Sequence, residues 1–161
     1  MSEYEIEVDV VVEEPVLAVA ALQQAVVAVL QYEGVQPPAG VSLLLTDDAQ
    51  LQQLNRDFRG YDKPTDVLSF PAGDEPIPGL PGYLGDIAIS VPTAQRQAAA
   101  AGHALADELL LLTVHGVLHL LGHDHGDADE RAVMWQAQGA VLRQLGVDPN
   151  KFPLAEEDDQ A

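Results

Sequence analysis

The sequence predicts a single-domain α+β protein with a mixed sheet of about four strands and helices packed on it. Two observations lead to this prediction. Along the chain, strand-like and helix-like patterns follow one another in the order strand, helix, strand, helix, strand, strand, helix, helix, helix, with no internal repeat. The 161 residues, 47% of them hydrophobic and 20% charged, are enough for one hydrophobic core and give no sign of a second domain.

The first half of the chain contains two predicted strands and two predicted helices. Residues 4–14 alternate apolar and acidic side chains with a period of two, which is typical of a strand with one buried face. Pro15 suits a helix start, and apolar residues at helical spacing extend that helix to about Leu30. The apolar run at 41–46 predicts the second strand, and the aspartates that open residues 47–58 predict the start of a short helix.

The second half contains two more predicted strands followed by helices. Residues 67–71 and 84–91 predict the strands, and the segment between them is rich in proline and glycine, which indicates a loop. Three helices are expected, at residues 92–101, 104–121 and 127–146. A sheet with its helices collected late in the chain favours the α+β class.

The composition limits the location of the protein. The chain has no cysteine and does not begin with a basic and apolar leader, so we expect a cytoplasmic protein. The apolar stretch at 16–30 is shorter than the roughly 20 residues that cross a bilayer, and Gln23 and Gln24 lie at its centre. The stretch at 105–122 contains two acidic residues and two histidines, which lipid disfavours. Both stretches therefore predict buried helices, and no membrane partner is expected.

The charge distribution is uneven. The formal net charge of −19 argues against a generally basic surface for nucleic acid. However, acidic residues crowd the N-terminus and the C-terminal residues 155–161, which we predict to be a disordered tail. Three of the seven basic residues, Arg56, Arg59 and Lys63, lie within eight positions of one another. The sequence therefore allows a local positive patch on an acidic protein.

Four of the five histidines lie in the segment HGVLHLLGHDH, residues 115–125. His115 and His119 are four residues apart, so on a helix they project from one face. Gly122 lets the chain leave the helix, and the following turn brings His125 towards the same point. Three neutral imidazoles with a fourth position open to water are typical of a catalytic zinc ion. We therefore predict one Zn²⁺ per chain, held by His115, His119 and His125 at the end of a long helix.

The remaining histidines are not expected to bind this metal. His123, two residues before His125, is predicted to point away, and His103 is interpreted as a surface or helix-junction residue. Asp86 and Asp124 are candidates to orient a ligand's second ring nitrogen, although Asp124 could also only cap the turn. Three imidazoles would accept nickel or copper as well as zinc, so the donor set alone does not identify the metal.

The spacing of the three predicted ligands also occurs in metzincin proteases, which supplies a rival interpretation. In those enzymes a glutamate follows the first histidine and acts as the general base. Here that position is Gly116. Without a carboxylate there, the usual mechanism of peptide hydrolysis has no proton acceptor. The sequence therefore disfavours a peptidase.

Three segments of the chain together carry a family resemblance. They are HGVLHLLGHDH with the preceding ELLLLTVHG, FRGYDKPTDVLSFP at 58–71, and LGDIAIS at 84–90. In content, order and spacing they resemble the YbeY family of bacterial rRNA maturation endoribonucleases. The resemblance covers roughly residues 4–146, so the whole chain, 1–161, is interpreted as one domain of this kind.

The resemblance implies a zinc-dependent endoribonuclease for single-stranded RNA, acting on the 3′ end of small-subunit rRNA and in ribosome quality control. Its implied partners are single-stranded rRNA and the ribosomal particle or ribosome-associated proteins. The family's functional arginine falls on Arg59, which could hold a phosphate or stabilise charge on a reacting phosphodiester. Two alternatives stay open at this point: a zinc peptidase, and a non-catalytic ribosome-assembly protein with a structural zinc.

Overall fold

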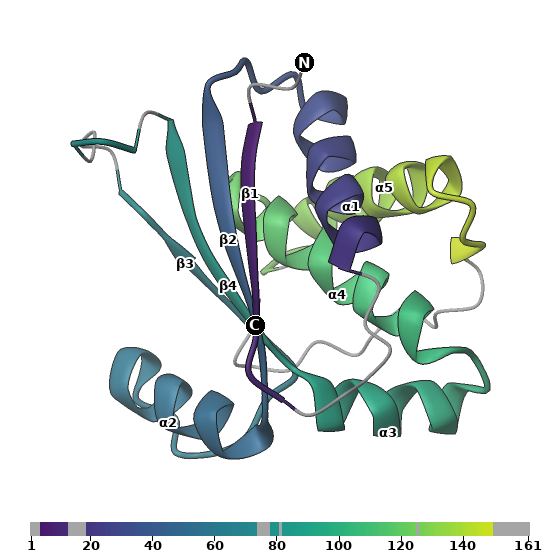
Figure 1. Ribbon diagram of the computed structural model, residues 1–161. Helices are drawn as coiled ribbons and strands as arrows, with labels where there is room; N and C mark the ends of the chain where they lie inside the picture. The colour runs from purple at the N-terminus through teal and green to yellow at the C-terminus, as the bar shows by residue number, and fades with distance from the viewer. Residues whose placement is uncertain (1–3, 13–18, 74–77, 81, 125, 150–161) are drawn as a thin grey trace.

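The computed structural model describes residues 4–12, 19–73, 78–80, 82–124 and 126–149 (Figure 1). The predicted disordered tail at 155–161 lies outside these residues. The elements in chain order are β1 (Tyr4–Val10), α1 (Val19–Tyr32), β2 (Ala39–Thr46), α2 (Asp48–Arg59), β3 (Val67–Pro71), β4 (Tyr83–Ser90), α3 (Val91–Ala101), α4 (Leu105–Leu120) and α5 (Ala128–Gln144). The order of strands and helices confirms the predicted α+β class.

The four strands form one mixed sheet in the order β1-β2-β4-β3. β1 pairs parallel with β2, and β2 pairs parallel with β4, whereas β3 runs antiparallel to β4 at the edge. Parallel neighbours need a crossover connection, which α1 supplies between β1 and β2. β4 lies between β2 and β3, and the edge strand β3 lies beside α4.

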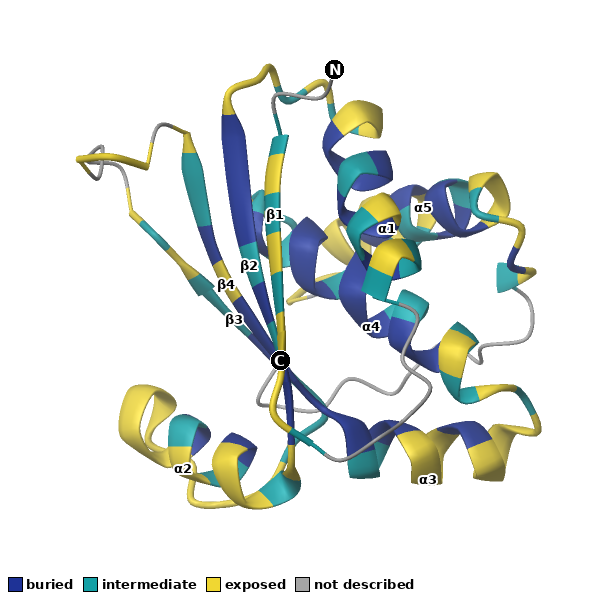
Figure 2. Ribbon diagram, in the orientation of Figure 1, coloured by how far each residue is buried: buried dark blue, intermediate teal, exposed yellow. Residues whose placement is uncertain are grey.

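The sheet carries helices on both faces, but unequally (Figures 1 and 2). Alternate residues of a strand point to opposite faces. Val41, Leu43 and Leu45 of β2 belong to the main core, which also contains buried residues of α1, α4 and α5. Leu44 faces the other way and packs with Leu51 of α2 in a smaller cluster. The long helix α4 is thus covered by the sheet and by neighbouring helices, which accounts for its mostly apolar sequence.

β1 is shorter than the predicted strand at 4–14, of which residues 13 and 14 lie outside the described part. It ends at Val10, whose partner in the register is Leu45 of β2. Thr46 ends β2, and Asp47 then caps α2 by accepting a hydrogen bond from the Gln50 amide. β1 can pair only as far as β2 extends. The alternating pattern in the sequence therefore continues beyond the end of the strand. The predicted start of the next helix at Pro15 also lies outside the described residues.

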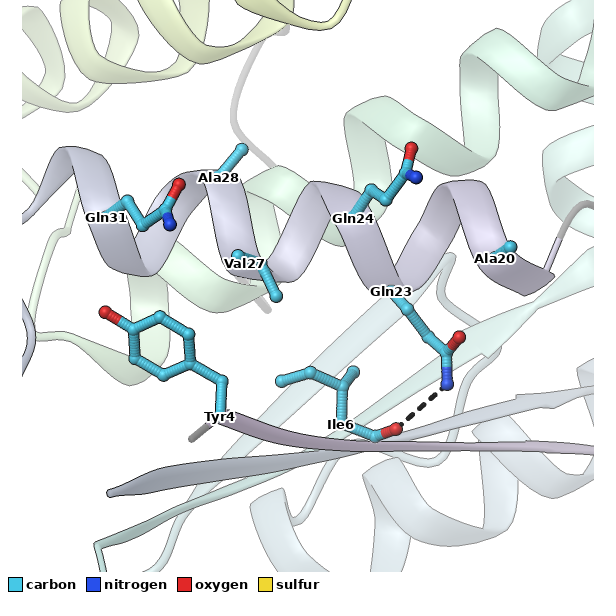
Figure 3. A pocket seen from close by; sticks show the side chains of 8 residues that line it. All are labelled: Tyr4, Ile6, Ala20, Gln23, Gln24, Val27, Ala28 and Gln31. Atoms are coloured by element: carbon cyan, nitrogen blue, oxygen red, sulfur yellow. Dashed lines mark hydrogen bonds between the residues drawn. The ribbon is translucent and has the colours of Figure 1, made fainter. Parts of the chain in front are cut away.

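Gln23 of α1 contacts β1 across the groove between the two elements (Figure 3). Gln23 Nε2 donates a hydrogen bond to the carbonyl oxygen of Ile6 at 3.0 Å. The hydroxyl of Tyr4 donates to the carbonyl oxygen of Val35 at 2.6 Å. The edge of a sheet exposes backbone groups that can pair with other chains, and a side-chain donor over a carbonyl reduces that exposure. Gln23 therefore helps to join α1 to the edge strand.

The two apolar stretches form the predicted buried helices. α1 places six of its residues in the interior, and α4 places nine there, Glu108 included. In the part of the chain that the structure describes, no single helix combines the length and hydropathy needed to cross a membrane. α3 and α4 meet those criteria only when taken together, and the chain bends by 116° between them.

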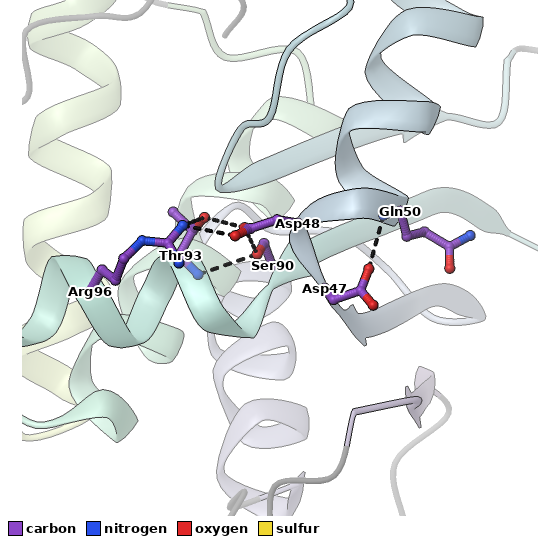
Figure 4. A network of polar contacts seen from close by, with 6 residues as sticks. All are labelled: Asp47, Asp48, Gln50, Ser90, Thr93 and Arg96. Atoms are coloured by element: carbon purple, nitrogen blue, oxygen red, sulfur yellow. Dashed lines mark hydrogen bonds and ion pairs between the residues drawn. The ribbon is translucent and has the colours of Figure 1, made fainter.

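Asp48 joins the start of α2 to the start of α3 (Figure 4). Ser90 Oγ and Thr93 Oγ1 both donate to Asp48 Oδ1, and Arg96 Nη2 lies 2.9 Å from Asp48 Oδ2. Burial raises the pKa of the Asp48 carboxyl, but the hydrogen bonds and the charge of Arg96 outweigh it, so the pKa lies below the ordinary value of 3.8. The folded protein therefore favours the ionised carboxylate more than the unfolded chain does.

Replacing Asp48 with asparagine is expected to lower the free energy of unfolding at neutral pH by on the order of 1 kcal/mol, because charge-assisted hydrogen bonds are lost. Solvent screens the partly exposed Arg96 pair, which limits the effect. A group with a depressed folded pKa stabilises the protein above its unfolded pKa, and this contribution disappears as the pH falls through the folded pKa. Urea unfolding from pH 7 down to pH 3 measures the loss. Asp57→Asn on the same helix is the control, and equal pH profiles for the two variants would contradict the prediction.

Candidate functional site

The last turns of α4 hold the two helical histidines that the sequence singled out. His115 and His119 face each other with their Nε2 atoms 3.1 Å apart and their ring centroids 4.7 Å apart. Two nitrogen ligands of a tetrahedral zinc ion, each about 2.0–2.1 Å from it, lie about 3.3–3.4 Å apart. The two nitrogens are therefore spaced nearly as one metal ion requires.

Gln138 of α5 orients the ring of His115. Its Oε1 lies 3.0 Å from His115 Nδ1, so Nδ1–H donates to the amide oxygen. The proton is then on Nδ1, and the lone pair of Nε2 is directed at the position shared with His119. Trp135, one turn earlier on α5, packs beside the same ring at 5.7 Å between centroids. The sequence analysis missed Gln138; the available signal was an amide within the apolar, core-facing stripe of α5.

Arg59 ends α2 and is placed by the turn that follows. Gly60 has φ 80°, a left-handed conformation that suits glycine, and its amide donates to the carbonyl of Arg56. The buried side chain of Asn55 donates to the Lys63 carbonyl at 3.0 Å, which ties the turn to the helix. The guanidinium carbon of Arg59 lies 5.6 Å from the centroid of the Tyr61 ring. These contacts direct an exposed arginine towards the edge of the sheet.

Arg59 and the two histidines line one cavity, although they come from distant parts of the sequence. The cavity has a volume of about 170 Å³, and its lining residues are Arg59, Val67, Leu68, Ser69, Pro71, His115 and His119. Among the described residues that line it there is one cation, two imidazoles and a hydroxyl, but no carboxylate. In the described part of the chain, Arg59 forms no ion pair. The cavity is therefore suited electrostatically to an anionic group.

Gly116 brings α4 close to the sheet behind this cavity. A Cβ atom at this position would lie 2.9 Å from Cγ2 of Ile87, too close for an ordinary contact. Ser69 Oγ of β3 donates to the Gly116 carbonyl at 3.0 Å, which joins β3 to α4. The position after His115 therefore faces the sheet and has no room for a longer side chain. This packing agrees with the absence of the glutamate that a metzincin-type peptidase would carry there.

The third predicted ligand, His125, lies outside the described residues. Within them, no three histidine, aspartate or glutamate side chains are grouped to hold a metal ion. His123 Nε2 lies 2.6 Å from Glu33 Oε1 at the end of α1, so this ring contacts α1. Asp86 accepts a hydrogen bond from the Tyr83 hydroxyl at 2.5 Å, and Gln138 takes the role at His115 that was considered for Asp86. The same role for Asp124 stays a prediction.

The interpretation of His103 as a surface residue is wrong, whereas its place at a helix junction is confirmed. It follows Gly102, where α3 ends, but its side chain is only 4% exposed. Its Nε2 lies 2.6 Å from Oε1 of Glu108, which is also buried. Burial raises the pKa of the Glu108 carboxyl, and the bond to His103 acts in the opposite direction. The sharp bend between α3 and α4 turns the ring inwards, which no local pattern in the sequence indicates.

Comparison with known proteins identifies the family of this chain. A family model described as endoribonuclease YbeY matches residues 7–146. A protein of that name from Moorella thermoacetica is 50% identical over 135 residues, which cover 80% of this chain and 86% of the relative. Another from a Roseiflexus species is 48% identical over 157 residues, covering 91% of this chain and 98% of the relative. A third, from Chloroflexus aggregans, is 49% identical over 148 residues, covering 87% and 96%.

A solved structure shares the fold. The solution structure of a Thermotoga maritima protein superposes with a TM-score of 0.59 and 24% sequence identity, over 97% of both chains. At this identity the likeness concerns the fold alone. The family model extends over nearly the whole fold, from within β1 to the end of α5, and so includes every residue that lines the cavity. The chain belongs to the endoribonuclease YbeY family.

Proposed function

We propose that this protein is a zinc-dependent endoribonuclease that cleaves single-stranded RNA in the cytoplasm, during maturation of the 3′ end of small-subunit rRNA and in ribosome quality control. The observation that carries the proposal is the single cavity lined by Arg59 and the His115–His119 pair. A cation beside two metal-binding imidazoles, without a carboxylate in the described lining, suits a phosphodiester better than a peptide. The family membership supports the same activity.

His115 and His119, with His125, would hold the zinc ion. The spacing of the two helical Nε2 atoms and the bond from His115 Nδ1–H to Gln138 fit neutral imidazole ligands. When bound, zinc supplies Lewis-acid chemistry at a phosphoryl group. The residues of the chain do the remaining work: Gln138 holds the His115 tautomer, and the Ser69–Gly116 hydrogen bond keeps β3 against α4, so that the cavity keeps its shape.

Arg59 would bind the phosphate. A guanidinium can donate two parallel hydrogen bonds to phosphate oxygens and stabilise the negative charge that grows on them as the bond to phosphorus breaks. The Tyr61 ring beside the guanidinium limits the orientations that it can take. Arg59 is thus arranged before the substrate arrives, which reduces the cost of ordering it on binding.

Incubation of the zinc-loaded protein with labelled rRNA precursor and with casein, each with and without a chelator, tests the proposal. Cleavage of the RNA alone, abolished by the chelator and restored by zinc, is the expected result. Hydrolysis of casein would indicate a metallopeptidase instead. Zinc binding without cleavage of either substrate, on free RNA and on ribosomal particles, would indicate a structural zinc in an assembly protein.

Replacing Gln138 with leucine is expected to lower the affinity for zinc about 10- to 100-fold, because the His115 ring loses the acceptor that sets its tautomer. Competition against a colorimetric zinc chelator measures the affinity directly. Gln136→Leu is the matched control, since Gln136 is exposed on the same helix. An unchanged affinity in Gln138→Leu would mean that the hydrogen bond to His115 does not support metal binding.

Affinity for RNA is expected to depend only weakly on salt. If Arg56, Arg59 and Lys63 supply two or three phosphate contacts to single-stranded RNA, the plot of log affinity against log salt has a slope of about −1.4 to −2.1. Fluorescence anisotropy over a salt series measures it. We expect modest affinity for free RNA and more efficient cleavage when the ribosomal particle presents the strand. A tight complex with naked RNA and a steep slope would contradict the prediction.

A further inference from the structure

A second cavity, of about 790 Å³, lies next to the first on the face of the sheet that carries α2. Its volume falls within the roughly 300–1,000 Å³ that is usual for ligand pockets. Its apolar lining includes Leu44, Leu54, Phe58, Phe70 and Ala88. We call this cavity the Phe58 groove. It shares Arg59, Ser69 and Pro71 with the cavity at the histidines, so the two are adjacent.

The ring of Phe58 is unusually exposed for a phenylalanine. The residue is 69% exposed, although it lines an apolar groove. Its contact with Phe70 is edge-on, with ring centroids 5.4 Å apart and planes inclined by 64°. With 69% of the residue exposed, this contact leaves most of the Phe58 ring open to solvent. Phe58 therefore offers a flat apolar surface that a planar ligand could cover.

Charged side chains of both signs line the Phe58 groove. Arg59 lies where the groove meets the histidine cavity, while Asp9 and Asp86 also line the groove. The carboxylates repel phosphate but accept hydrogen bonds from N–H groups. A nucleotide bound here would place its phosphate at Arg59, away from the carboxylates, and its base against the apolar side chains.

We infer that the Phe58 groove binds an unstacked base of single-stranded RNA, next to the phosphate held by Arg59, with Phe58 stacking on the base. The inference rests on the proposed function and assigns a substrate-binding role to a residue outside the histidine cavity. Aromatic side chains that stack on bases beside a cationic residue are a common means of holding single strands. A base paired in a duplex cannot enter the groove, so stacking at Phe58 also accounts for a preference for single strands.

The test needs no protein variant in its first arm. Abasic residues are placed in turn at each position of a short labelled single-stranded RNA, and binding to the zinc-loaded protein is measured. An abasic residue next to the cleaved phosphate is expected to weaken binding about 5- to 150-fold, the usual contribution of one stacked base. Abasic residues elsewhere are expected to have much smaller effects.

The second arm uses Phe58→Ala, Phe58→Leu and, as a matched control, Tyr32→Ala, which removes a half-exposed aromatic ring at the end of α1. Phe58→Ala is expected to weaken binding as much as the sensitive abasic residue does, and the two changes together should be no worse than either alone. Phe58→Leu keeps an apolar side chain against Phe70 but removes the ring. It therefore distinguishes the loss of stacking on the base from the loss of packing against Phe70. Stacking is insensitive to salt, so Phe58→Ala should leave the salt slope unchanged, whereas Arg59→Ala should reduce its magnitude by about 0.7.

The outcomes separate this inference from the proposed function. If the wild-type protein cleaves RNA but neither the abasic residues nor Phe58→Ala affects binding, the inference is overturned and the nuclease proposal stands. If Phe58→Ala impairs cleavage only in ribosomal particles and not on free RNA, a protein partner occupies the groove and the inference is also overturned. If the zinc-loaded wild-type protein neither binds nor cleaves RNA, the proposed function itself fails, and the inference fails with it.

Discussion

Replacing Arg59 with alanine is expected to lower the rate of RNA cleavage about 100- to 1,000-fold, as removal of one preorganised charge-stabilising donor does in other enzymes. The guanidinium lines the same cavity as His115 and His119, and in the described part of the chain it has no carboxylate partner. Its charge is therefore available to a phosphate. Single-turnover cleavage of a labelled single-stranded RNA measures the effect on the chemical step.

Three controls make the Arg59 result specific. Arg59→Lys should recover only part of the activity, because lysine keeps the charge and loses the planar pair of donors. Arg56→Ala removes an exposed arginine from the same helix that pairs with Asp57 and lines neither cavity, so it should have a much smaller effect. Zinc content should be unchanged in all three variants. Full activity in Arg59→Ala would leave Arg59 without a catalytic role.

Replacing His119 with alanine is expected to abolish stoichiometric zinc binding and, with it, cleavage. The wild-type protein should contain one zinc per chain and the variant none, by elemental analysis after dialysis. In the wild-type protein, the Nε2 atoms of His115 and His119 lie 3.1 Å apart, close enough to bind one zinc ion together. The variant keeps only one of these two ligands. His123→Gln is the control, because His123 contacts Glu33. Loss of zinc from His123→Gln with retention in His119→Ala would show that the ligands are assigned wrongly.

Zinc should also stabilise the fold, since a metal that binds only the native state shifts unfolding by mass action. At a free zinc concentration 100 times its dissociation constant, the stabilisation is about 2.7 kcal/mol. For a domain of this size that corresponds to a rise in melting temperature of about 5–11 °C. The wild-type protein should lose this increment on chelation, and His119→Ala should show none. A melting temperature that does not respond to zinc in the wild type would contradict the linkage.

Local patterns were sufficient for much of the fold. The alternation that starts at residue 4, the helical spacing in α1 and α4, and the capping aspartates of α2 and α5 each depend on neighbours a few residues away. Each predicted an element of the right type in the right part of the chain. The pairing of His115 with His119 is of the same kind, because one helical turn brings them together. The end of β1 was predicted too late because it depends on where its partner strand stops.

Contacts between distant segments could be known only from the tertiary structure. A sequence pattern indicates the periodicity of one element, but it does not indicate which other element packs against it across the core. The strand order β1-β2-β4-β3, with β3 antiparallel at the edge, brings Arg59 to the histidines. The same packing places Gln138 against His115 and buries His103 beside Glu108. The sequence thus specified which side chains have the chemistry, while the packing of α4 between the sheet and α5 decided which of them meet.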